Sequence, residues 1–422
     1  MIFADKNSLK DNISCLLAET KKALTELPLW ERYFTLFWLF GPFFLLIERS
    51  PADAWLTIVA LTFVVRALLK RDGTFLRAFW VRATFAFWGI CLLSSALSPF
   101  PAYSLGEAII WIRFPLFAMA SLYWLARDKR LIHAMFISTA IGMMVMTGIL
   151  TAEILIVGAQ NGRLSWPYGD LVPGNYLAKV GMPAFLILAG LSLSKVKTFK
   201  FWAILATVFT LIISFLTGER INFILRLCSG ILAGIVWKPD FRILAGLSFA
   251  AILVVLIFVF ADIPADSRYT RHFFKQLPFH TESIYFKTMI GGFWAFQEAP
   301  IFGIGTGNYR LLCEEIAIDL PNIACNTHPH NYYVQLLGET GIIGLISGSV
   351  MIITIIWFCF VTGARKRSNI LAATAFVVPF GLFFPIQTTA DFFGQWNNIF
   401  LWSAVALALA TRNVLSNDDN TS

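Results

Sequence analysis

The stretch IIGLISGSVMIITIIWFCFVTG, residues 342–363, contains no Asp, Glu, Lys or Arg, and the basic run Arg365-Lys366-Arg367 follows it closely. An apolar run of roughly 17–25 residues spans about 30 Å of hydrocarbon when it is helical. A helix also satisfies its own backbone hydrogen bonds in lipid, which an open strand does not. This stretch therefore predicts a transmembrane helix. Similar apolar segments occur at 33–47, 52–69, 83–98, 106–126, 131–157, 175–194, 201–217, 221–237, 243–261, 370–387 and 396–411.

The composition of the whole chain agrees with this interpretation. Of its 422 residues, 58% are hydrophobic and 14% are Asp, Glu, Lys or Arg, whereas an ordinary soluble domain carries about 25% charged residues. The mean hydropathy of +0.71 leaves too little polar surface to cover a water-soluble particle. We therefore predict an all-α polytopic membrane protein with about twelve transmembrane helices and an integral-membrane fold.

Basic residues cluster in every second connector between the apolar segments. Short loops that are rich in Lys and Arg stay in the cytoplasm, so residues 1–32 and the tail 412–422 are predicted to be cytoplasmic, and the alternate connectors face outward. Residues 1–32 also lack the features of a signal peptide. The net charge of +8 is dispersed among the connectors, which argues against nucleic acid as a partner. The clusters are Lys70/Arg71, Arg127/Lys129/Arg130, Lys195/Lys197/Lys200, Lys238/Arg242 and Arg365/Lys366/Arg367.

One connector is much longer than the others and divides the chain into parts. Residues 33–261 hold the first nine apolar segments, 262–341 form a large outward loop, and 342–411 hold the last three segments. Long polar insertions in compact folds are commonly functional. A shorter outward segment, 162–170, is dense in turn formers and aromatic residues, and it suits either a surface that grips a polar ligand or an interfacial loop.

Two of the five histidines lie close together in the large loop, in Thr327-His328-Pro329-His330-Asn331-Tyr332-Tyr333. The residues from Asn331 to Thr340 predict a short helix that Gly341 ends. His330 would then lie near a helix N-terminus, where the macrodipole disfavours imidazolium and keeps the ring neutral. A neutral imidazole can act as a general base. The alternatives are a capping histidine and, less favoured, a metal ligand, because no Cys or carboxylate follows at a familiar ligand spacing.

Two arginines occupy unexpected positions in the predicted topology. Arg220, in Thr217-Gly218-Glu219-Arg220, lies at an outer helix end, where the distribution of basic residues does not place it. Its planar guanidinium suits a lipid diphosphate, and the alternative is an anchor paired with Glu219. Arg113 lies inside an apolar segment, where charges are costly and usually functional; its alternative is burial against Glu107 or Glu153.

A glycine-rich stretch, residues 299–310, follows a predicted amphipathic helix from Ser283 to Glu298. Its glycines lack the spacing of a dinucleotide or phosphate-binding loop, so we predict a close-packed turn that carries Arg310 toward the site. The sequence also contains no Asp-x-Asp pair, no Gly-x-Ser-x-Gly and no His-Glu-x-x-His. We therefore predict no cofactor and no metal.

The cysteines at 313 and 325 differ from the other four because both lie in the predicted outer loop. An oxidising compartment would permit a disulfide between Cys313 and Cys325 that staples the approach to the histidine pair. The alternative is two free thiols.

These features together resemble the O-antigen ligase and O-antigen polymerase superfamily of bacterial inner membranes. The broad motif of that family is His followed by Asn, Ser or Gln, then nine residues, then Gly-x-x-Gly. Here it reads His330-Asn331, nine residues from Tyr332 to Thr340, and Gly341-Ile342-Ile343-Gly344. The stretches 162–170, 218–220, 300–310, 325–344 and Ala390-Asp391-Phe392-Phe393 are also similar to the family.

The resemblance implies transfer of a glycan from undecaprenyl diphosphate to a hydroxyl group at the periplasmic face. It implies His330 as the general base, Arg220 with Arg113 and Arg310 at the donor diphosphate, and a metal-independent, inverting reaction. The chain departs from the family where a second Arg is often found, because position 285 is Tyr. That charge would have to come from another residue: Arg163, Arg271, Lys287 or Arg310.

Among the reactions of this superfamily we expect an O-antigen ligase, whose acceptor is lipid A–core. The alternatives are the polymerase of the same superfamily and a ligase that acts on a protein hydroxyl. A lipid-linked oligosaccharide flippase would also have many membrane helices and arginines, but it would not need a reactive histidine in an outer loop. Supporting roles are expected for the neighbours of the main residues: His328, Asn331, Glu219 and Asp391.

Overall fold

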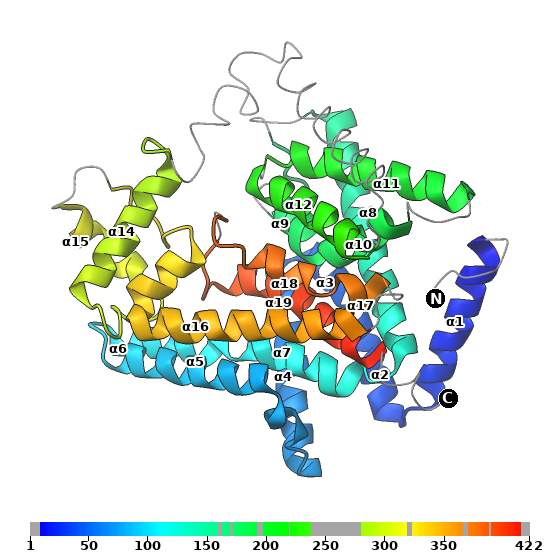
Figure 1. Ribbon diagram of the computed structural model, residues 1–422, viewed down its shortest axis with the longest axis horizontal. Helices are drawn as coiled ribbons and strands as arrows, with labels where there is room; N and C mark the ends of the chain where they lie inside the picture. The colour runs from blue at the N-terminus through cyan, green and yellow to red at the C-terminus, as the bar shows by residue number, and fades with distance from the viewer. Residues whose placement is uncertain are drawn as a thin grey trace.

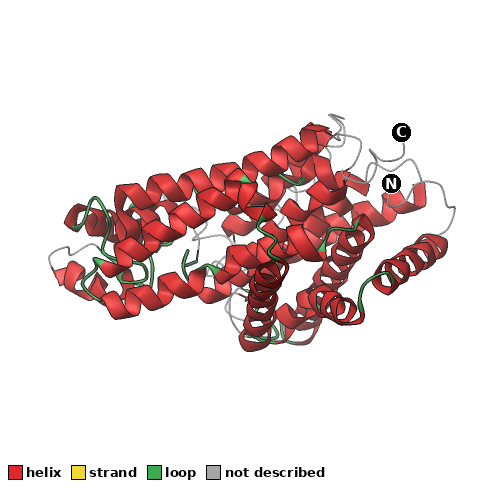
Figure 2. Cartoon of the chain, turned by 90° about the horizontal axis from the view of Figure 1, so that it is seen from below, coloured by secondary structure: helices red, strands yellow, loops and turns green. Residues whose placement is uncertain are grey.

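The computed structural model describes residues 9–158, 163–168, 172–191, 197–218, 220–237, 280–318, 323–365, 370–387 and 390–414. Figure 2 shows helices joined by loops throughout these residues, with no strand. The all-α class is therefore confirmed. The predicted segment 243–261, Glu219 and Arg271 lie outside the described residues.

The first part of the chain folds into helices that follow one another with short connections. They are α1 (Leu9–Thr25), α2 (Leu29–Leu39), α3 (Gly41–Ile47), α4 (Arg49–Lys70), α5 (Phe79–Ala96), α6 (Pro101–Trp111), α7 (Arg113–Ala120) and α8 (Lys129–Ile156). The later helices are α9 (Val172–Asn175), α10 (Met182–Leu191), α11 (Lys197–Leu216), α12 (Arg220–Trp237), α14 (Ile284–Glu298), α15 (Tyr309–Ile318), α16 (Tyr332–Arg365), α17 (Ile370–Thr374), α18 (Val377–Leu382) and α19 (Gln395–Ala410).

Five helical stretches of the described residues are long and apolar enough to cross a membrane: Arg49–Lys70, Phe79–Ala96, Pro101–Leu125, Lys129–Ile156 and Tyr332–Ala364. The chain is thus a multi-pass membrane protein by length and composition of its helices. The number twelve and the sidedness of the loops stay predictions.

Two apolar segments that read as single helices are broken in the structure. The segment 33–47 divides at Phe40 into α2 and α3, because Pro42 stands at the start of α3 and has no N–H to continue the helix. The segment 370–387 divides into α17 and α18 around Ala375 and Phe376, where Pro379 likewise lacks a donor. The helix of residues 342–363, by contrast, begins earlier, at Tyr332, and bends at Gly341.

Helices α5 and α16 run side by side along the longest axis of the molecule (Figure 1). The second half of α16 packs along α5, α14 packs on the first half of α16, and α4 and α19 pack on α7. In Figure 1, α6, α14 and α15 gather toward the left end, while α1, α2 and the end of α19 lie toward the right. The loop that carries the histidine pair therefore lies toward the end opposite to α1.

Aromatic side chains fill the centre of the bundle. Trp111, which is 1% exposed, stacks on Phe392 at 5.8 Å between ring centroids and meets Trp402 edge-on at 6.0 Å. Aromatic pairs of this kind add to the free energy gained by burial. They fix segment 390–393, which precedes α19, against the end of α6.

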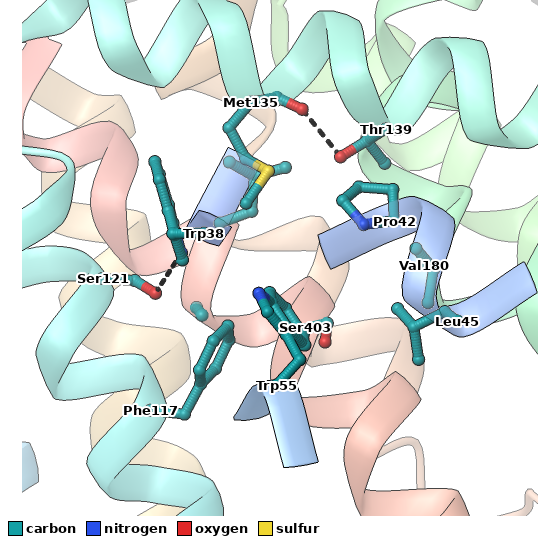
Figure 3. Close-up of a pocket in the computed structure, with 12 residues that line it drawn as sticks. Trp38, Pro42, Leu45, Trp55, Phe117, Ser121, Met135, Thr139, Val180 and Ser403 are labelled. Atoms are coloured by element: carbon teal, nitrogen blue, oxygen red, sulfur yellow. Dashed lines mark hydrogen bonds between the residues drawn. The ribbon is translucent and has the colours of Figure 1, made fainter. Parts of the chain in front are cut away.

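A small cavity lies where α2, α3, α4, α7, α8 and α19 meet (Figure 3). The Trp38 indole donates to Ser121 Oγ at 3.1 Å, and Thr139 Oγ1 donates to the Met135 carbonyl at 2.8 Å. The residues that line the cavity are apolar, Ser or Thr, so none brings an ionisable group. This cavity is therefore part of the apolar core.

Candidate active site

Asn331 caps the start of α16 and hydrogen-bonds to the segment that follows α18. Its Oδ1 accepts hydrogen bonds from the N–H groups of Tyr333 (3.0 Å) and Val334 (3.2 Å), which is the geometry of a helix N-cap. Its Nδ2 donates to the carbonyls of Pro385 (2.8 Å) and Gln387 (3.4 Å). The predicted helix start at Asn331 is confirmed, and the side chain that provides it also fixes the segment after α18.

His330 sits directly before this cap in a left-handed backbone conformation, with φ +57°. Its ring packs edge-on against Tyr285 at 5.3 Å and against His328 at 4.2 Å between centroids. A non-glycine residue in this region carries strain of about 1–3 kcal/mol, which surrounding contacts must hold in place. The ring is thus oriented from two sides.

The hydrogen bond between Asn326 and His330 defines the state of the imidazole. Asn326 Oδ1 accepts from the N–H of Thr327 at 2.7 Å, so its Nδ2 is the atom that faces His330 Nε2 at 2.8 Å. An amide NH₂ can only donate. His330 Nε2 therefore accepts, which requires a neutral ring with an unprotonated Nε2, the form that a general base needs.

Helix α14 supports the histidine pair from one side. Ser283 caps this helix by accepting from the Tyr285 N–H at 3.2 Å, and Thr288 Oγ1 approaches the Pro329 carbonyl at 3.4 Å. A Cβ on Gly292 would lie 2.9 Å from Pro329 Cγ, so only glycine allows this approach. The predicted amphipathic helix from Ser283 to Glu298 is therefore confirmed. Lys287, in its first turns, is half-buried.

The bend at Gly341 contacts the glycine-rich stretch at residues 299–310. Gly341 has φ +67° and ψ −170°, and a Cβ there would lie 2.2 Å from the Ile301 carbonyl oxygen. The bend turns the N–H of Ile342 toward the Pro300 carbonyl, to which it donates at 3.0 Å. The predicted helix end at Gly341 corresponds to this bend, after which α16 continues.

Glu339, two residues before the bend, is fully buried and organises the loop that leads to α15. It accepts hydrogen bonds from the N–H groups of Gly307 (3.0 Å) and Tyr309 (3.4 Å) and from Gln335 Nε2 (3.1 Å). A buried carboxyl group needs hydrogen-bond partners, and here one carboxyl group serves three donors. The predicted close-packed turn is thus held by the Glu339 side chain on α16.

This turn carries Arg310 to Asp391. The guanidinium Nη2 lies 2.5 Å from Asp391 Oδ2, and Gln335 Nε2 donates to Asp391 Oδ1 at 2.6 Å. Burial lowers the pKa of Arg310, but Asp391, with smaller contributions from Tyr103, Glu107 and Glu339, outweighs it and raises the pKa above its ordinary value. Arg310 is therefore a permanently charged group beside the first turns of α16, with part of its charge already paired.

A disulfide joins Cys313 in α15 to Cys325, with the two Cα atoms 5.5 Å apart. Cys313 packs with Ala295, Ile304 and Tyr309 in a small apolar cluster. The bridge fixes residues 323–326, which lead to His328, against that cluster. The alternative of two free thiols does not hold in this structure.

The Arg220 region forms a second group of residues, on α12. Gly218, with φ +75°, ends α11, and Arg220 begins α12. The Leu164 N–H donates to the Leu216 carbonyl at 3.0 Å, so segment 163–168, including the half-buried Arg163, adjoins this corner. Glu153 holds the same segment by accepting from the Trp166 N–H at 2.9 Å.

Arg113 is paired with Asp53, at 2.8 Å between Nη2 and Oδ1. The alternative was burial against Glu107 or Glu153. Glu107 does contribute electrostatically to Arg113, but the carboxyl group of Glu153 binds the backbone of Ser165 and Trp166 instead. The partner sits on α4, about 60 positions earlier in the chain, where sequence alone does not place it.

Sequence reasoning missed several residues of this site, although one pattern could have revealed two of them. Asn331, Gln335 and Glu339 recur at every fourth position, so they lie on one face of the first half of α16. A polar stripe at helical spacing beside an apolar segment is a signal of a buried network. Asn326 and Tyr285 carry no such pattern, because their contacts to His330 arise from the fold of the loop.

Among the described residues, no three His, Cys, Asp or Glu side chains gather in a way that could hold a metal ion. Residues 205–348 match the family model described as O-antigen ligase. The matched range runs from α11 to the bend in α16 and so includes Arg220, the disulfide, His330 and Glu339. No curated protein matches the chain.

Proposed function

We propose that this member of the O-antigen ligase and polymerase superfamily is an O-antigen ligase: it transfers a glycan from undecaprenyl diphosphate to a sugar hydroxyl of lipid A–core, at the periplasmic face of the bacterial inner membrane. The observation that carries the proposal is the neutral His330, whose Nε2 accepts from Asn326 at 2.8 Å within the family-matched residues. A base in this state is what activation of a sugar hydroxyl requires.

His330 acts as the general base in this mechanism. Asn326 turns away, and Nε2 takes the proton of the acceptor hydroxyl as the hydroxyl oxygen attacks the anomeric carbon. The new glycosidic bond forms while the bond from the anomeric carbon to the diphosphate oxygen breaks, and undecaprenyl diphosphate leaves with the bonding electron pair. A single displacement of this kind inverts the anomeric configuration.

Arg220 stabilises the negative charge that develops on the departing diphosphate. Preorganised cations at such a position lower the barrier more than any other single contribution. Arg113 and Arg310 already pair with Asp53 and Asp391. We therefore assign them a weaker, long-range contribution to the diphosphate.

The role of His330 is tested with purified protein in liposomes that contain a lipid-linked glycan and lipid A–core. We expect His330→Ala to lower the transfer rate about 10²–10⁴-fold, the usual share of general base catalysis. His280→Ala is the matched control, since His280 lies in the same loop before α14 and its side chain accepts from the neighbouring Glu282 N–H. Transfer by folded His330→Ala at the wild-type rate would disprove this role.

The role of Arg220 is tested through the donor. We expect Arg220→Lys to weaken donor use and Arg220→Ala nearly to abolish it, because a point charge lacks the planar fork of the guanidinium. Arg82→Lys serves as the control, since Arg82 is an exposed arginine over the Phe79 ring. Unchanged donor kinetics in Arg220→Ala would remove Arg220 from the site.

The molecule that accepts the glycan distinguishes an O-antigen ligase from a polymerase and from a protein-directed ligase. In a deletion strain, loss of a ligase leaves uncapped core and accumulated long polymer. Loss of a polymerase leaves single repeat units on core, and loss of a protein-directed ligase leaves lipopolysaccharide intact and a glycoprotein unmodified. A flippase would show no glycan transfer at all in liposomes.

A further inference from the structure

Arg226 is a fully buried guanidinium inside the apolar part of α12. Among the described residues, its Nε and Nη1 atoms have no hydrogen-bond partner. Its Nη2 approaches the thioether of Met143, at 3.4 Å to Sδ, and its guanidinium carbon lies 4.2 Å from the centroid of the Phe185 ring. A sulfur atom is a weak acceptor, so most of the donors of this side chain are unused.

The other two buried cations of the described residues, Arg66 and Lys179, have oxygen partners. Arg66 pairs with Glu31 at 3.2 Å, and Lys179 Nζ donates to Asn397 Oδ1. No described carboxylate lies within ion-pair distance of Arg226. Among the buried cations of the described residues, Arg226 is thus the one that lacks an oxygen partner.

The contacts that Arg226 makes compensate its burial only in part. A cation–π contact with Phe185 recovers some electrostatic energy, but removal of an ion from water costs more than a single ring returns. The side chain cannot reach the membrane interface either, because none of its surface is exposed. An intramembrane charge in this situation is a functional-site candidate whose missing partner is an anion.

We propose that Arg226 binds a phosphate group carried by a polyprenyl lipid, either the glycan donor or the carrier released from it. The proposal rests on the proposed function, which brings such a lipid to Arg220. Arg226 lies six residues farther along the same helix, or about 9 Å along its axis. The anion is lipid-borne because the residue lies within an apolar helix, where a free ion would have to leave water.

Movement of the Met143 side chain would let the phosphate group reach the Arg226 guanidinium. The Met143 side chain is fully buried, and its sulfur occupies the position beside Nη2 that a phosphate oxygen would take. Methionine is unbranched and adapts its conformation easily. When it turns aside, the guanidinium offers Nε, Nη1 and Nη2 to the phosphate, which is the planar arrangement that binds phosphate oxygens in pairs.

The test uses the full chain in nanodiscs of phosphatidylcholine, with undecaprenyl phosphate as the probe and native mass spectrometry as the measure of binding. We expect Arg226→Met to weaken binding at least tenfold and Arg226→Lys to weaken it less. Arg82→Met should bind like the wild type, because Arg82 is exposed on α5. Equal binding by folded Arg226→Met would overturn the proposal.

Two further probes separate the sources of phosphate. Phosphatidylglycerol should compete at least tenfold more weakly than undecaprenyl phosphate, and inorganic phosphate should not compete. Equal competition by phosphatidylglycerol would overturn the assignment to a polyprenyl lipid, and competition by inorganic phosphate would overturn the lipid-borne assignment.

Thermal unfolding gives an independent measure. Without added lipid, Arg226→Met should unfold at a higher temperature than the wild type, because an unpaired buried charge has been replaced by an apolar side chain. Added undecaprenyl phosphate should raise the unfolding temperature of the wild type and leave that of the variant unchanged. A variant that unfolds earlier yet gains the full stabilisation from the lipid would contradict the proposal.

The two proposals fail in different ways. If His330→Ala loses transfer and Arg226→Met transfers and binds normally, the proposed function stands and Arg226 has no role. If Arg226→Met loses binding of undecaprenyl phosphate while His330→Ala still transfers glycan, the lipid site stands and the base assignment fails.

Met143→Leu should bind the lipid at least as well as the wild type, because it removes the Sδ contact without removing the guanidinium.

Discussion

At the scale of single residues, one amide determines whether His330 can take a proton. Asn326 donates to Nε2 and so matches the neutral ring. Asn326→Asp would place a carboxylate there, which favours the protonated imidazole. We expect the acidic limb of the pH–rate profile of glycan transfer to move to higher pH, with activity lost below neutrality and recovered in alkali.

Asn326→Ala tests the loss of the hydrogen bond to His330 without the negative charge that Asn326→Asp adds. It removes the donor without adding an anion, so the rate should fall through poorer orientation of the ring while the acidic limb keeps its position. If the aspartate and alanine variants have the same pH–rate profile, Nε2 of His330 is not the group that takes the proton.

The ion pair of Arg310 and Asp391 gives a second prediction at this scale. The two side chains are 34% and 10% exposed, so water screens part of their attraction. We expect a double-mutant cycle with Arg310→Met and Asp391→Asn to give a coupling free energy of about 1 kcal/mol in unfolding. The measurement is reversible unfolding in detergent, and additive effects of the two substitutions would show that the pair contributes nothing.

At the scale of elements, the bend in α16 joins the membrane helix to the segment that carries His330. Gly341 has φ +67°, and a Cβ there would meet the Ile301 carbonyl at 2.2 Å. Gly341→Ala should lower the free energy of unfolding by about 1–3 kcal/mol and reduce transfer, because the loop must move away from α16. Gly89→Ala is the control: Gly89 lies within α5 with open space around it, so added helix propensity should leave the protein as stable or slightly more stable.

The features that could be predicted from the sequence are those that depend on neighbours along the chain. The helix from Asn331 to Gly341 follows from a cap and a glycine, and the two cysteines lie twelve residues apart. The pairing of Gln335 with Asp391 and that of Arg113 with Asp53 depend on residues more than fifty positions away, which local patterns do not determine. The break before Pro42 does not show in the hydropathy of segment 33–47, because a proline can stand inside an apolar run without lowering it.

At the scale of the whole molecule, the loop that precedes α16 and the turn between α5 and α6 form one unit. Ser104 Oγ donates to the Thr306 carbonyl at 2.9 Å, and Ser94 Oγ donates to the Glu339 carbonyl at 2.9 Å. Whichever face of the membrane holds the α5–α6 turn therefore also holds the Glu339 network and, through α16, His330. The sidedness of one short turn decides the sidedness of the site.

This link allows the orientation to be measured at exposed positions away from the site. In a variant with Cys15, Cys91, Cys228 and Cys359 replaced by serine, the disulfide stays intact and no other thiol remains. Ala102→Cys, on the exposed start of α6, should react with a membrane-impermeant maleimide in intact spheroplasts. Arg71→Cys, in the basic connector after α4, should react only after permeabilisation, since short basic loops stay in the cytoplasm. The reverse pattern would place His330 on the cytoplasmic face, where neither a periplasmic glycan acceptor nor an oxidising environment for the disulfide is available.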